Sequence, residues 1–389
     1  MSEIVLNSEL LNKVFDGKEI THNDACQIYQ ELEDSPFEIY KAAQILRNKN
    51  KGRIVTYSRK VFFNLINLCR DTCSYCTYKS EPGEYKMSMM SKQDISRLAL
   101  LGSNHRCTEA LFVTGERPEQ KYEEARMWLK ENGFTSTAEY LIHASEIALN
   151  AGLFPHTNAG NLTKHEMRQL KNTNPSLGIM LENSSNRLVE KYMPHEFAPS
   201  KNPRARIQTL ENAGELSIPM TTGLLIGIGE TPLEIIDSIF AIKSIHQRYG
   251  HIQEIILQNF QPKPNTAMQN IPGPEERYFK TIVALTRLII PKMNIQIPPN
   301  LSPDSYSGFL QTGINDWGGI SPITPDYVNP EFSWPSIDTV QKKCEDAGFE
   351  IRARFPVYPE FFSMVNPDLR ARMLEIADSD HLVNKEYLK

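Results

Sequence analysis

A short stretch near residue 70 constrains this chain more than any other. It holds Cys69, Cys73 and Cys76, which are half of the six cysteines in the sequence and are spaced C-x3-C-x2-C. Six cysteines scattered at random over a chain of this length would give that spacing about 0.001 times. Chance is therefore a poor explanation, and three thiols on one short loop usually bind metal.

Spacing alone leaves the kind of metal site open. A structural zinc site takes four protein ligands, and no CxxC or CxxH pair follows nearby to complete one. A three-cysteine zinc site with a distant fourth ligand, or a group of reduced thiols without metal, stays possible. Three cysteines suit a 4Fe–4S cluster in which the fourth iron is left for another ligand.

The composition is that of an ordinary globular protein. Of the 389 residues 40% are hydrophobic and 23% charged, which allows one large domain or two small ones. A net charge of −5 gives no reason to expect nucleic acid. No segment approaches the ~18 apolar residues of a membrane span, and the N-terminus lacks the basic region of a signal peptide. We expect a cytoplasmic protein, with no membrane partner, in which Cys26, Cys107 and Cys344 are buried thiols.

The predicted elements divide the chain into three segments. Residues 1–52 are predicted to form a helical N-terminal extension, 53–360 the main domain and 361–389 a C-terminal tail. In the main domain strand-like runs alternate with helical ones. The predicted strands are 61–68, 110–114, 154–158, 177–182, 220–228, 252–260, 294–297 and 313–317.

Repeated units of strand then helix predict a parallel sheet, and about eight of them predict an α/β fold of the (β/α)8 TIM-barrel type. Functional residues of such barrels lie on the loops that follow the strands. The cysteine loop follows the first predicted strand, and polar or glycine-rich groups follow the other seven. We expect one mouth of the barrel to gather 114–116, His156, Asn158, Glu182, 227–230, 258–260, 299–300 and 315–319.

The cysteine loop resembles the C-x3-C-x-Φ-C signature of the radical S-adenosylmethionine (SAM) enzymes, where Φ is aromatic and is Tyr75 here. The resemblance implies that Cys69, Cys73 and Cys76 hold a 4Fe–4S cluster. It also implies that the amine and carboxylate of SAM chelate the fourth iron, and that Tyr75 packs near the adenine.

Two glycine-containing stretches resemble SAM-binding motifs of the same enzymes. In the first, Gly115 and Glu116 match a glycine-glycine-glutamate motif that holds the methionyl ammonium, with Thr114 in place of the first glycine. The second, 223–231, is similar to a G-x-I-x-G-x-G-E stretch, which implies that Gly227 and Ile228 face the adenosyl group. A dinucleotide-binding fingerprint fails there because a proline occupies its third-glycine position. The structural alternative for both stretches is a tight turn between strand and helix.

Two charged residues also match places that contact SAM in the biotin-synthase-like subgroup. Glu182 would contact the ribose or amino group, and Arg206 would hold the carboxylate with its planar guanidinium. Arg204 competes with Arg206 for that role, and either could be an ordinary surface residue of a helix.

Several longer stretches resemble one radical SAM family more closely. Together they are similar to the first subunit of the 7,8-didemethyl-8-hydroxy-5-deazariboflavin synthases, the family that makes the deazaflavin chromophore Fo. The similarity covers roughly residues 53–360, and its last stretch is the most specific. The stretches are 56–59, 115–119, 155–158, 258–264, 298–302 and 313–330.

That resemblance implies a reaction and its partners. A radical SAM carbon–nitrogen lyase would convert 5-amino-5-(4-hydroxybenzyl)-6-(D-ribitylimino)-5,6-dihydrouracil to Fo, releasing ammonia, 5′-deoxyadenosine and methionine. A companion radical SAM subunit would make this small-molecule substrate from tyrosine and 5-amino-6-ribitylaminouracil. A low-potential donor such as ferredoxin or flavodoxin would supply the electron.

Polar residues on the predicted loops are candidates for contacts with this substrate. Asp316 and His156 are the candidates for catalysis, and Asp316 is also expected to bind the substrate. The other expected substrate ligands are Asn158, Asn259, Asn300 and Asn315. Each could instead stabilise its own loop.

Other functions stay open at this point. The companion subunit shares the fold and cluster, although the stretch 317–322 favours the first subunit. Another tyrosine- or biotin-type radical SAM enzyme is a second alternative. A non-enzymatic iron–sulfur carrier or scaffold is a third, but it has no need for Glu116, Arg206 or the glycines of 223–231.

Overall fold

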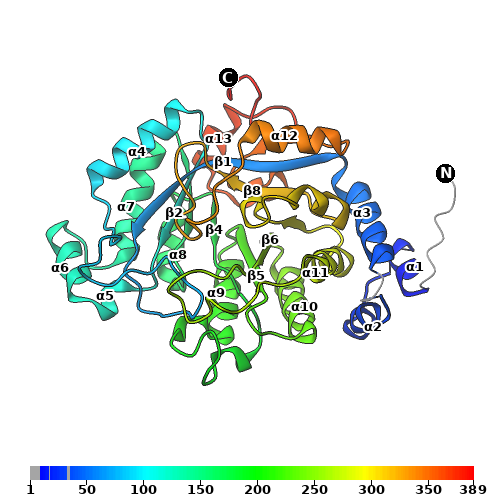
Figure 1. The fold of residues 1–389 in the computed structure, drawn as a ribbon. Helices are drawn as coiled ribbons and strands as arrows, with labels where there is room; N and C mark the ends of the chain where they lie inside the picture. The colour runs from blue at the N-terminus through cyan, green and yellow to red at the C-terminus, as the bar shows by residue number, and fades with distance from the viewer. Residues whose placement is uncertain (1–8, 17, 33–35) are drawn as a thin grey trace.

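The computed structural model describes residues 9–16, 18–32 and 36–389, so 1–8, 17 and 33–35 of the predicted extension lie outside the described residues. Figure 1 shows a central barrel of strands with helices around it. The strands are β1 Ile54–Ile66, β2 Glu109–Thr114, β3 Phe154–Asn158, β4 Ser176–Gly178, β5 Met220–Ile226, β6 Ile252–Asn259, β7 Asn294–Gln296, β8 Asp316–Ile320 and β9 Glu350–Arg354.

Helices follow most of the strands. The α-helices are α1 Glu9–Phe15, α2 His22–Leu32, α3 Phe37–Lys51, α4 Lys92–Asn104, α5 Pro118–Lys121, α6 Glu123–Glu131, α7 Thr137–Asn150, α8 Lys164–Leu170, α9 Pro203–Glu215, α10 Pro232–Tyr249, α11 Glu276–Ile289, α12 Ile337–Asp346 and α13 Pro367–Leu374. The 3-10 helices are η1 Asn186–Val189, η2 Pro199–Lys201, η3 Pro299–Leu301, η4 Tyr306–Thr312 and η5 Pro359–Met364.

Strands β1 to β8 close into a parallel barrel, which confirms the predicted fold. The order is β2 to β8 and then β1, and β1 also pairs with β2 from Lys60↔Glu109 to Ile66↔Thr114. The strands are buried on both faces, as parallel barrel strands are. Capping boxes at Ser91, Thr163 and Thr231 start three of the outer helices, each worth about 1 kcal/mol.

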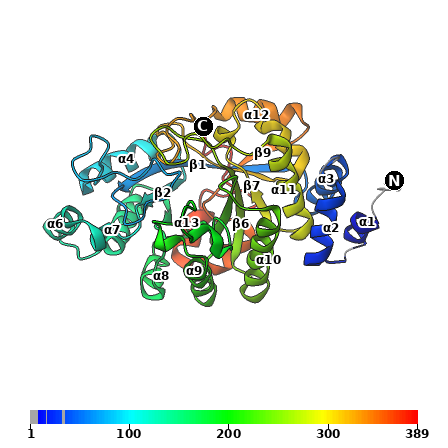
Figure 2. The same cartoon turned by 60° about the horizontal axis from the view of Figure 1, so that its bottom comes forward.

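Helices α1–α3 lie outside the barrel beside α10 and α11, as Figures 1 and 2 both show. Tyr40 of α3 donates its hydroxyl to the carbonyl of Arg277 on α11 at 3.0 Å. The buried Arg47 donates to the carbonyls of Ile314 and Ile54, which ties α3 to the start of β1. Domain boundaries at residues 52 and 360 stay predictions.

The N-terminal end of the barrel is closed by the chain that leaves β9. Strand β9 pairs with the first half of β1, and residues 355–358 then cross under the barrel. The carbonyl of Pro356 accepts from Ser176 of β4 at 2.5 Å and from Gln253 of β6 at 3.1 Å. Among the described residues, this stretch therefore seals the N-terminal end, and the cavity opens at the C-terminal ends of the strands.

A layer of charged side chains fills the barrel interior near its N-terminal end. Arg354 donates to both carboxylate oxygens of Asp316 at 2.7 and 3.0 Å, and to Glu254 at 2.9 Å. Tyr358 donates to the same Glu254 oxygen at 2.5 Å. Arg354 and Glu254 are 4% and 3% exposed, and Asp316 is fully buried. A buried charge is tolerated only when it is paired in this way.

The predicted position of the eighth strand was wrong. Residues 313–317 were expected to be the strand and 315–319 its following loop, but the strand is Asp316–Ile320. Gly318 and Gly319 look like a turn in the sequence, yet they are strand residues. A Cβ on Gly318 would lie 2.0 Å from the amide of Gln296, and a Cβ on Gly319 would lie 2.0 Å from Lys60. Glycine is used there because other side chains already fill the barrel.

Within the described part of the chain, none of the helices is both long and apolar enough to span a membrane.

Candidate active site

A large cavity opens at the C-terminal ends of the strands. Its volume is about 300 Å³. Pockets for drug-sized ligands have about 300–1000 Å³, so this cavity has the size of a small-molecule site. Residues from the cysteine loop, from all eight barrel units and from the loop after β8 line it, as expected for a TIM-type barrel.

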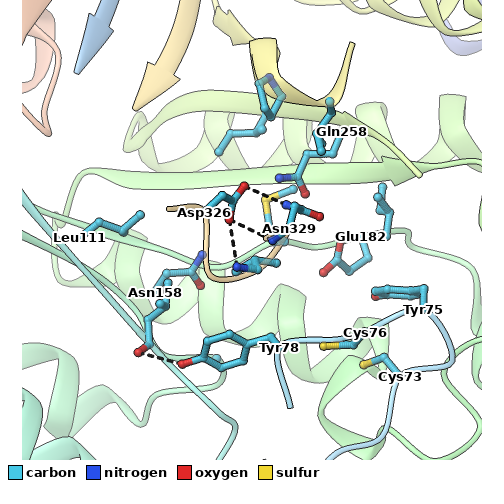
Figure 3. A pocket seen from close by; sticks show the side chains of 18 of the residues that line it. Cys73, Tyr75, Cys76, Tyr78, Leu111, Asn158, Glu182, Gln258, Asp326 and Asn329 are labelled. Carbon is cyan, nitrogen blue, oxygen red and sulfur yellow. Dashed lines mark hydrogen bonds between the residues drawn. The ribbon is translucent and has the colours of Figure 1, made fainter. Parts of the chain in front are cut away.

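The cysteine loop forms one wall of the cavity, and Cys69, Cys73 and Cys76 all line it. Its backbone is held from neighbouring loops, since Thr72 N donates to Phe197 O at 2.8 Å and Ser74 N donates to Pro194 O at 2.9 Å. Cys73, Cys76, Tyr75 and Glu182 lie together in Figure 3, with Leu111 on the opposite side. These hydrogen bonds fix the path of the loop along the cavity wall.

The three thiols fit an iron–sulfur cluster. Burial raises the pKa of the Cys69 thiol to about 11 and that of Cys73 to about 12, so metal must displace their protons on binding. Among the residues that the structure describes, no three His, Cys, Asp or Glu side chains converge as the ligands of a single metal ion would. Three cysteines around one cavity wall suit a cluster of several irons better than one zinc ion.

Gly115 and Glu116 pack directly on the cysteine loop. A Cβ on Gly115 would lie 1.9 Å from the carbonyl oxygen of Leu68, so only glycine allows this approach. The backbone N–H of Glu116 donates to the sulfur of Cys69 at 3.2 Å, and Arg70 N donates to Glu116 O at 2.8 Å. The predicted motif and the cysteines thus form one unit.

The Glu116 carboxylate points into a buried, mostly polar corner. The side chain is 6% exposed, and one of its oxygens accepts from Asn161 N at 3.1 Å. Burial raises the pKa of Glu116, and the nearby guanidinium of Arg206 opposes that rise. Arg206 donates to the carbonyls of Ser200 and Met180 at 2.9 Å each. These two predicted residues line the same cavity from different barrel units.

Glu182 is held in the left-handed region at φ 63°, a conformation that a non-glycine residue adopts at a cost. One carboxylate oxygen accepts from Lys201, while the other is buried without a hydrogen-bond partner. Burial raises the pKa of Glu182, but the charges of Lys201 and Arg206 outweigh it and hold the pKa below its ordinary value. An orphaned, ionised oxygen at a cavity wall is suited to a ligand donor.

Tyr75 lines the cavity next to Glu182, and its hydroxyl is 2.9 Å from His195 Nε2. Its ring packs against an apolar cluster that contains Ile228 and Phe260. Gly227 and Ile228, expected at the adenosyl group, are absent from the cavity lining. Their backbone N–H groups both donate to Glu230, at 2.6 and 2.8 Å. Gly227 and Ile228 therefore lie outside the cavity lining, and Ile228 packs in the apolar cluster that Tyr75 contacts.

The structure places both candidate catalytic residues, Asp316 and His156, in buried contacts within the barrel. Asp316 begins β8 at the sealed end of the barrel and is ion-paired with Arg354, because the strand starts where the loop was expected. His156 is buried below the cavity and lies 2.7 Å from Ser176 Oγ. Burial lowers the pKa of His156 to about 4, so its ring stays neutral. Neither residue lines the cavity.

Two of the expected substrate ligands are also structural. Asn315 accepts from Arg287 and from Ile295 N at 2.9 Å each, which fixes the chain before β8. Asn300 donates to Asp326 at 3.0 Å and so holds the loop after β8. Asn158 and Asn259 do line the cavity, as predicted.

Sequence reasoning missed several residues that line the cavity. Some come from the interior of strands, where polar residues were not expected, and others from the loop after β8. The first part of that loop, residues 321–330, lies inside the stretch that resembled the deazaflavin family most closely, and residues 331–335 follow it. The missed residues include Lys60, Asp71, Lys201, Lys263, Gln296, Asp326, Asn329 and Trp334.

Comparison with solved structures supports the fold. The crystal structure of methylornithine synthase aligns with a TM-score of 0.69 at 16% identity, covering 88% of this chain and 97% of that one. The FeFe-hydrogenase maturase HydG from Carboxydothermus hydrogenoformans aligns with a TM-score of 0.69 at 19% identity, covering 94% and 87%. At these identities the likeness concerns the fold alone.

Comparison of sequences goes further. The family description Radical SAM superfamily matches residues 63–242. The chain is 45% identical to the 7,8-didemethyl-8-hydroxy-5-deazariboflavin synthase of Methanopyrus kandleri, over 79% of this chain and 92% of that protein. It is 44% identical to the protein of that name from Methanocaldococcus jannaschii, over 83% and 88%. It is 39% identical to the FO synthase of Nocardia farcinica, over 93% of this chain and 44% of that protein.

These matches agree with the cavity. The radical SAM superfamily uses a 4Fe–4S cluster and SAM, which confirms the two predicted cofactors, and the cysteine loop lines the cavity at the mouth of the barrel. The chain is a radical SAM enzyme and belongs to the family of 7,8-didemethyl-8-hydroxy-5-deazariboflavin synthases.

Proposed function

We propose that this chain is the Fo-forming subunit, a carbon–nitrogen lyase that converts 5-amino-5-(4-hydroxybenzyl)-6-(D-ribitylimino)-5,6-dihydrouracil to Fo with release of ammonia. The observation that carries the proposal is the 45% identity to a protein named for Fo synthesis, over 92% of that protein's length. The predicted cysteine loop, Gly115 and Glu116 also meet at one cavity.

The substrate of this reaction would be supplied by a companion radical SAM subunit that couples tyrosine to 5-amino-6-ribitylaminouracil. The chain spans 44% of the FO synthase of Nocardia farcinica. The electron would come from a low-potential donor such as ferredoxin or flavodoxin.

The cavity divides into two ends of different chemistry. Glu116, Glu182 and Arg206 gather near the cysteines and provide buried charges for the ammonium, the ribose or amino group and the carboxylate of SAM. At the other end, amide side chains of Gln258 and Asn259 line the wall. Amides donate and accept hydrogen bonds together, which suits a uracil ring and a ribityl chain.

The cluster and SAM, when bound, supply a 5′-deoxyadenosyl radical that abstracts hydrogen from the substrate. The protein must hold the two molecules in contact and exclude water. The sealed lower barrel and the loop after β8 enclose the substrate end. That loop is tied to the barrel by Thr324, whose hydroxyl accepts from Phe62 N at 3.0 Å.

Substrate choice tests the proposal. Anaerobically reconstituted protein is supplied with SAM, reductant and either the coupled dihydrouracil or free tyrosine plus 5-amino-6-ribitylaminouracil. We expect fluorescent Fo from the coupled substrate alone. Formation of the coupled compound from the two free precursors would instead identify the chain as the companion subunit. SAM cleavage without conversion of either supply would point to another radical SAM reaction.

Glu116→Gln tests the SAM end of the cavity. The change removes the charge proposed to face the methionyl ammonium and keeps the side chain's shape. Loss of a charge-assisted hydrogen bond costs about 1.5–3 kcal/mol, or roughly 10–150-fold in SAM affinity. Equilibrium dialysis with labelled SAM measures it, with the exposed Glu124→Gln on α6 as control. Equal SAM affinity in both variants would remove Glu116 from the site.

A further inference from the structure

Lys60 is a buried cation that the sequence analysis did not single out. It lies in the middle of β1, opposite Glu109 of β2, and lines the cavity with only 8% of its surface exposed. The structure gives its ammonium group no hydrogen bond or ion pair with any residue it describes. A buried charge without a partner is costly, so the position indicates a partner that arrives with the ligand.

The neighbouring strand β8 leaves space for the Lys60 side chain. A Cβ on Gly319 of β8 would lie 2.0 Å from Cδ and Cε of Lys60 and 2.2 Å from its Nζ. Any side chain at 319 would therefore displace the lysine. The glycine leaves the space through which the lysine chain passes, and this explains why β8 carries glycine where a barrel strand ordinarily has a packed side chain.

Aromatic rings surround the ammonium group. Nζ lies 4.3 Å from the ring centroid of Phe62 and 5.4 Å from that of Trp334, within the range of cation–π attraction. The two rings are stacked, with centroids 6.1 Å apart. They belong to an apolar group that also contains Tyr78, Leu111 and Val113, packed against Tyr327 and Val328.

The charged groups that face Lys60 from other elements are engaged elsewhere. Glu109 of β2 accepts from Ser58, and Asp326 of the loop after β8 accepts from Asn300 and from three donors of its own loop. Glu254 of β6 and Arg354 of β9 pair with each other. The neutral ring of His156 faces it from β3. Burial lowers the pKa of Lys60, which makes its N–H a stronger donor.

We propose that Lys60 is a substrate-binding residue that donates a charge-assisted hydrogen bond to the phenolic oxygen of the 4-hydroxybenzyl group. This inference rests on the proposed function. The aromatic walls fit a benzyl ring, and the ammonium among them fits the one polar atom that such a ring carries. The amide side chains of Gln258 and Asn259 would then hydrogen-bond to the uracil and ribityl groups of the substrate. Lys60 then favours the phenolate form of whatever phenol is bound.

The test uses Fo itself, because its hydroxyl is the former phenol and changes the absorbance of the chromophore when it ionises. Fo is titrated from low to high pH free in solution and bound to the reconstituted wild-type protein. We expect bound Fo to ionise at a pH at least one unit lower than free Fo. This comparison needs no variant, so it holds even if a substitution at Lys60 prevents folding.

Two substitutions assign the effect to Lys60. Lys60→Met keeps the aliphatic chain and removes the charge, and we expect the shift to vanish and affinity for ionised Fo to fall roughly 10–150-fold. Lys60→Arg should retain most of the shift. The exposed Lys130→Met on α6 is the matched control, and iron content of each variant reports its folding.

The outcomes separate the two proposals. If the wild-type protein does not bind Fo, the proposed function fails and this inference fails with it. If Fo binds but ionises at the same pH as in solution, or if Lys60→Met shifts its ionisation as the wild type does, only the inference is overturned. A lowered ionisation pH that Lys60→Met abolishes supports both.

Discussion

Cys73→Ala is expected to leave the protein without its iron–sulfur cluster and without any SAM cleavage. The three cysteines that line the cavity are Cys69, Cys73 and Cys76, and they are the cysteines of the cluster-binding signature. Two thiols cannot hold a cluster that needs three, so the loss should be complete. Iron content and visible absorbance after anaerobic reconstitution measure the effect.

The other cysteines provide matched controls. Cys344 accepts a hydrogen bond from Trp317 at 3.2 Å and Cys107 donates to the carbonyl of Lys60 at 3.7 Å, both buried away from the cavity. Cys26, expected to be buried, is only half-buried on α2. Alanine at each of the three should retain about four irons per chain. Loss of the cluster in the Cys107 variant would show that the three-ligand account is wrong.

Asp316→Asn is expected to destabilise the fold by about 3–5 kcal/mol, the usual cost of removing one partner of a buried ion pair. Arg354, 4% exposed, loses the negative charge that its Nε and Nη2 contact. Of the two carboxylates to which it donates, Glu254 then remains. The expected result is a large fall in the denaturant concentration at the midpoint of unfolding. Far-ultraviolet circular dichroism under anaerobic conditions measures it.

Asp304→Asn is the control, because that residue is exposed and such changes are usually within about 0.5 kcal/mol. The comparison separates a structural from a catalytic aspartate. Unchanged stability together with lost Fo formation would return Asp316 to the active site and contradict its place at the sealed end of the barrel.

The sequence predicted the architecture and one end of the site well. Strand–helix alternation predicted the barrel, and the cysteine spacing and the motif at Glu116 predicted residues that meet in space. These succeeded because each depends on local spacing or on the rule that loops after parallel strands share one mouth. Glu182 followed from the same rule, whereas Arg206, on helix α9, was predicted from its match to the biotin-synthase-like subgroup.

The errors have physical origins in the barrel interior. The barrel interior is polar, whereas strands were assigned from apolar runs. Polar residues at 56–60 therefore hid the first seven residues of β1, which begins at Ile54 rather than residue 61. The glycines of β8 hid the true start of that strand at Asp316. Arg354 pairs with Asp316, and Gly319 leaves space for Lys60. Both contacts join residues that are far apart in the sequence, so no local sequence pattern predicts them.

The most direct test of the account is the balance of products in one anaerobic reaction. Reconstituted protein, SAM, reductant and the coupled dihydrouracil are incubated, and Fo, ammonia and 5′-deoxyadenosine are quantified together. The account predicts that all three appear in equal amounts and that Cys73→Ala yields none of them. 5′-Deoxyadenosine with neither Fo nor ammonia, from substrate that is demonstrably bound, would contradict the proposed reaction.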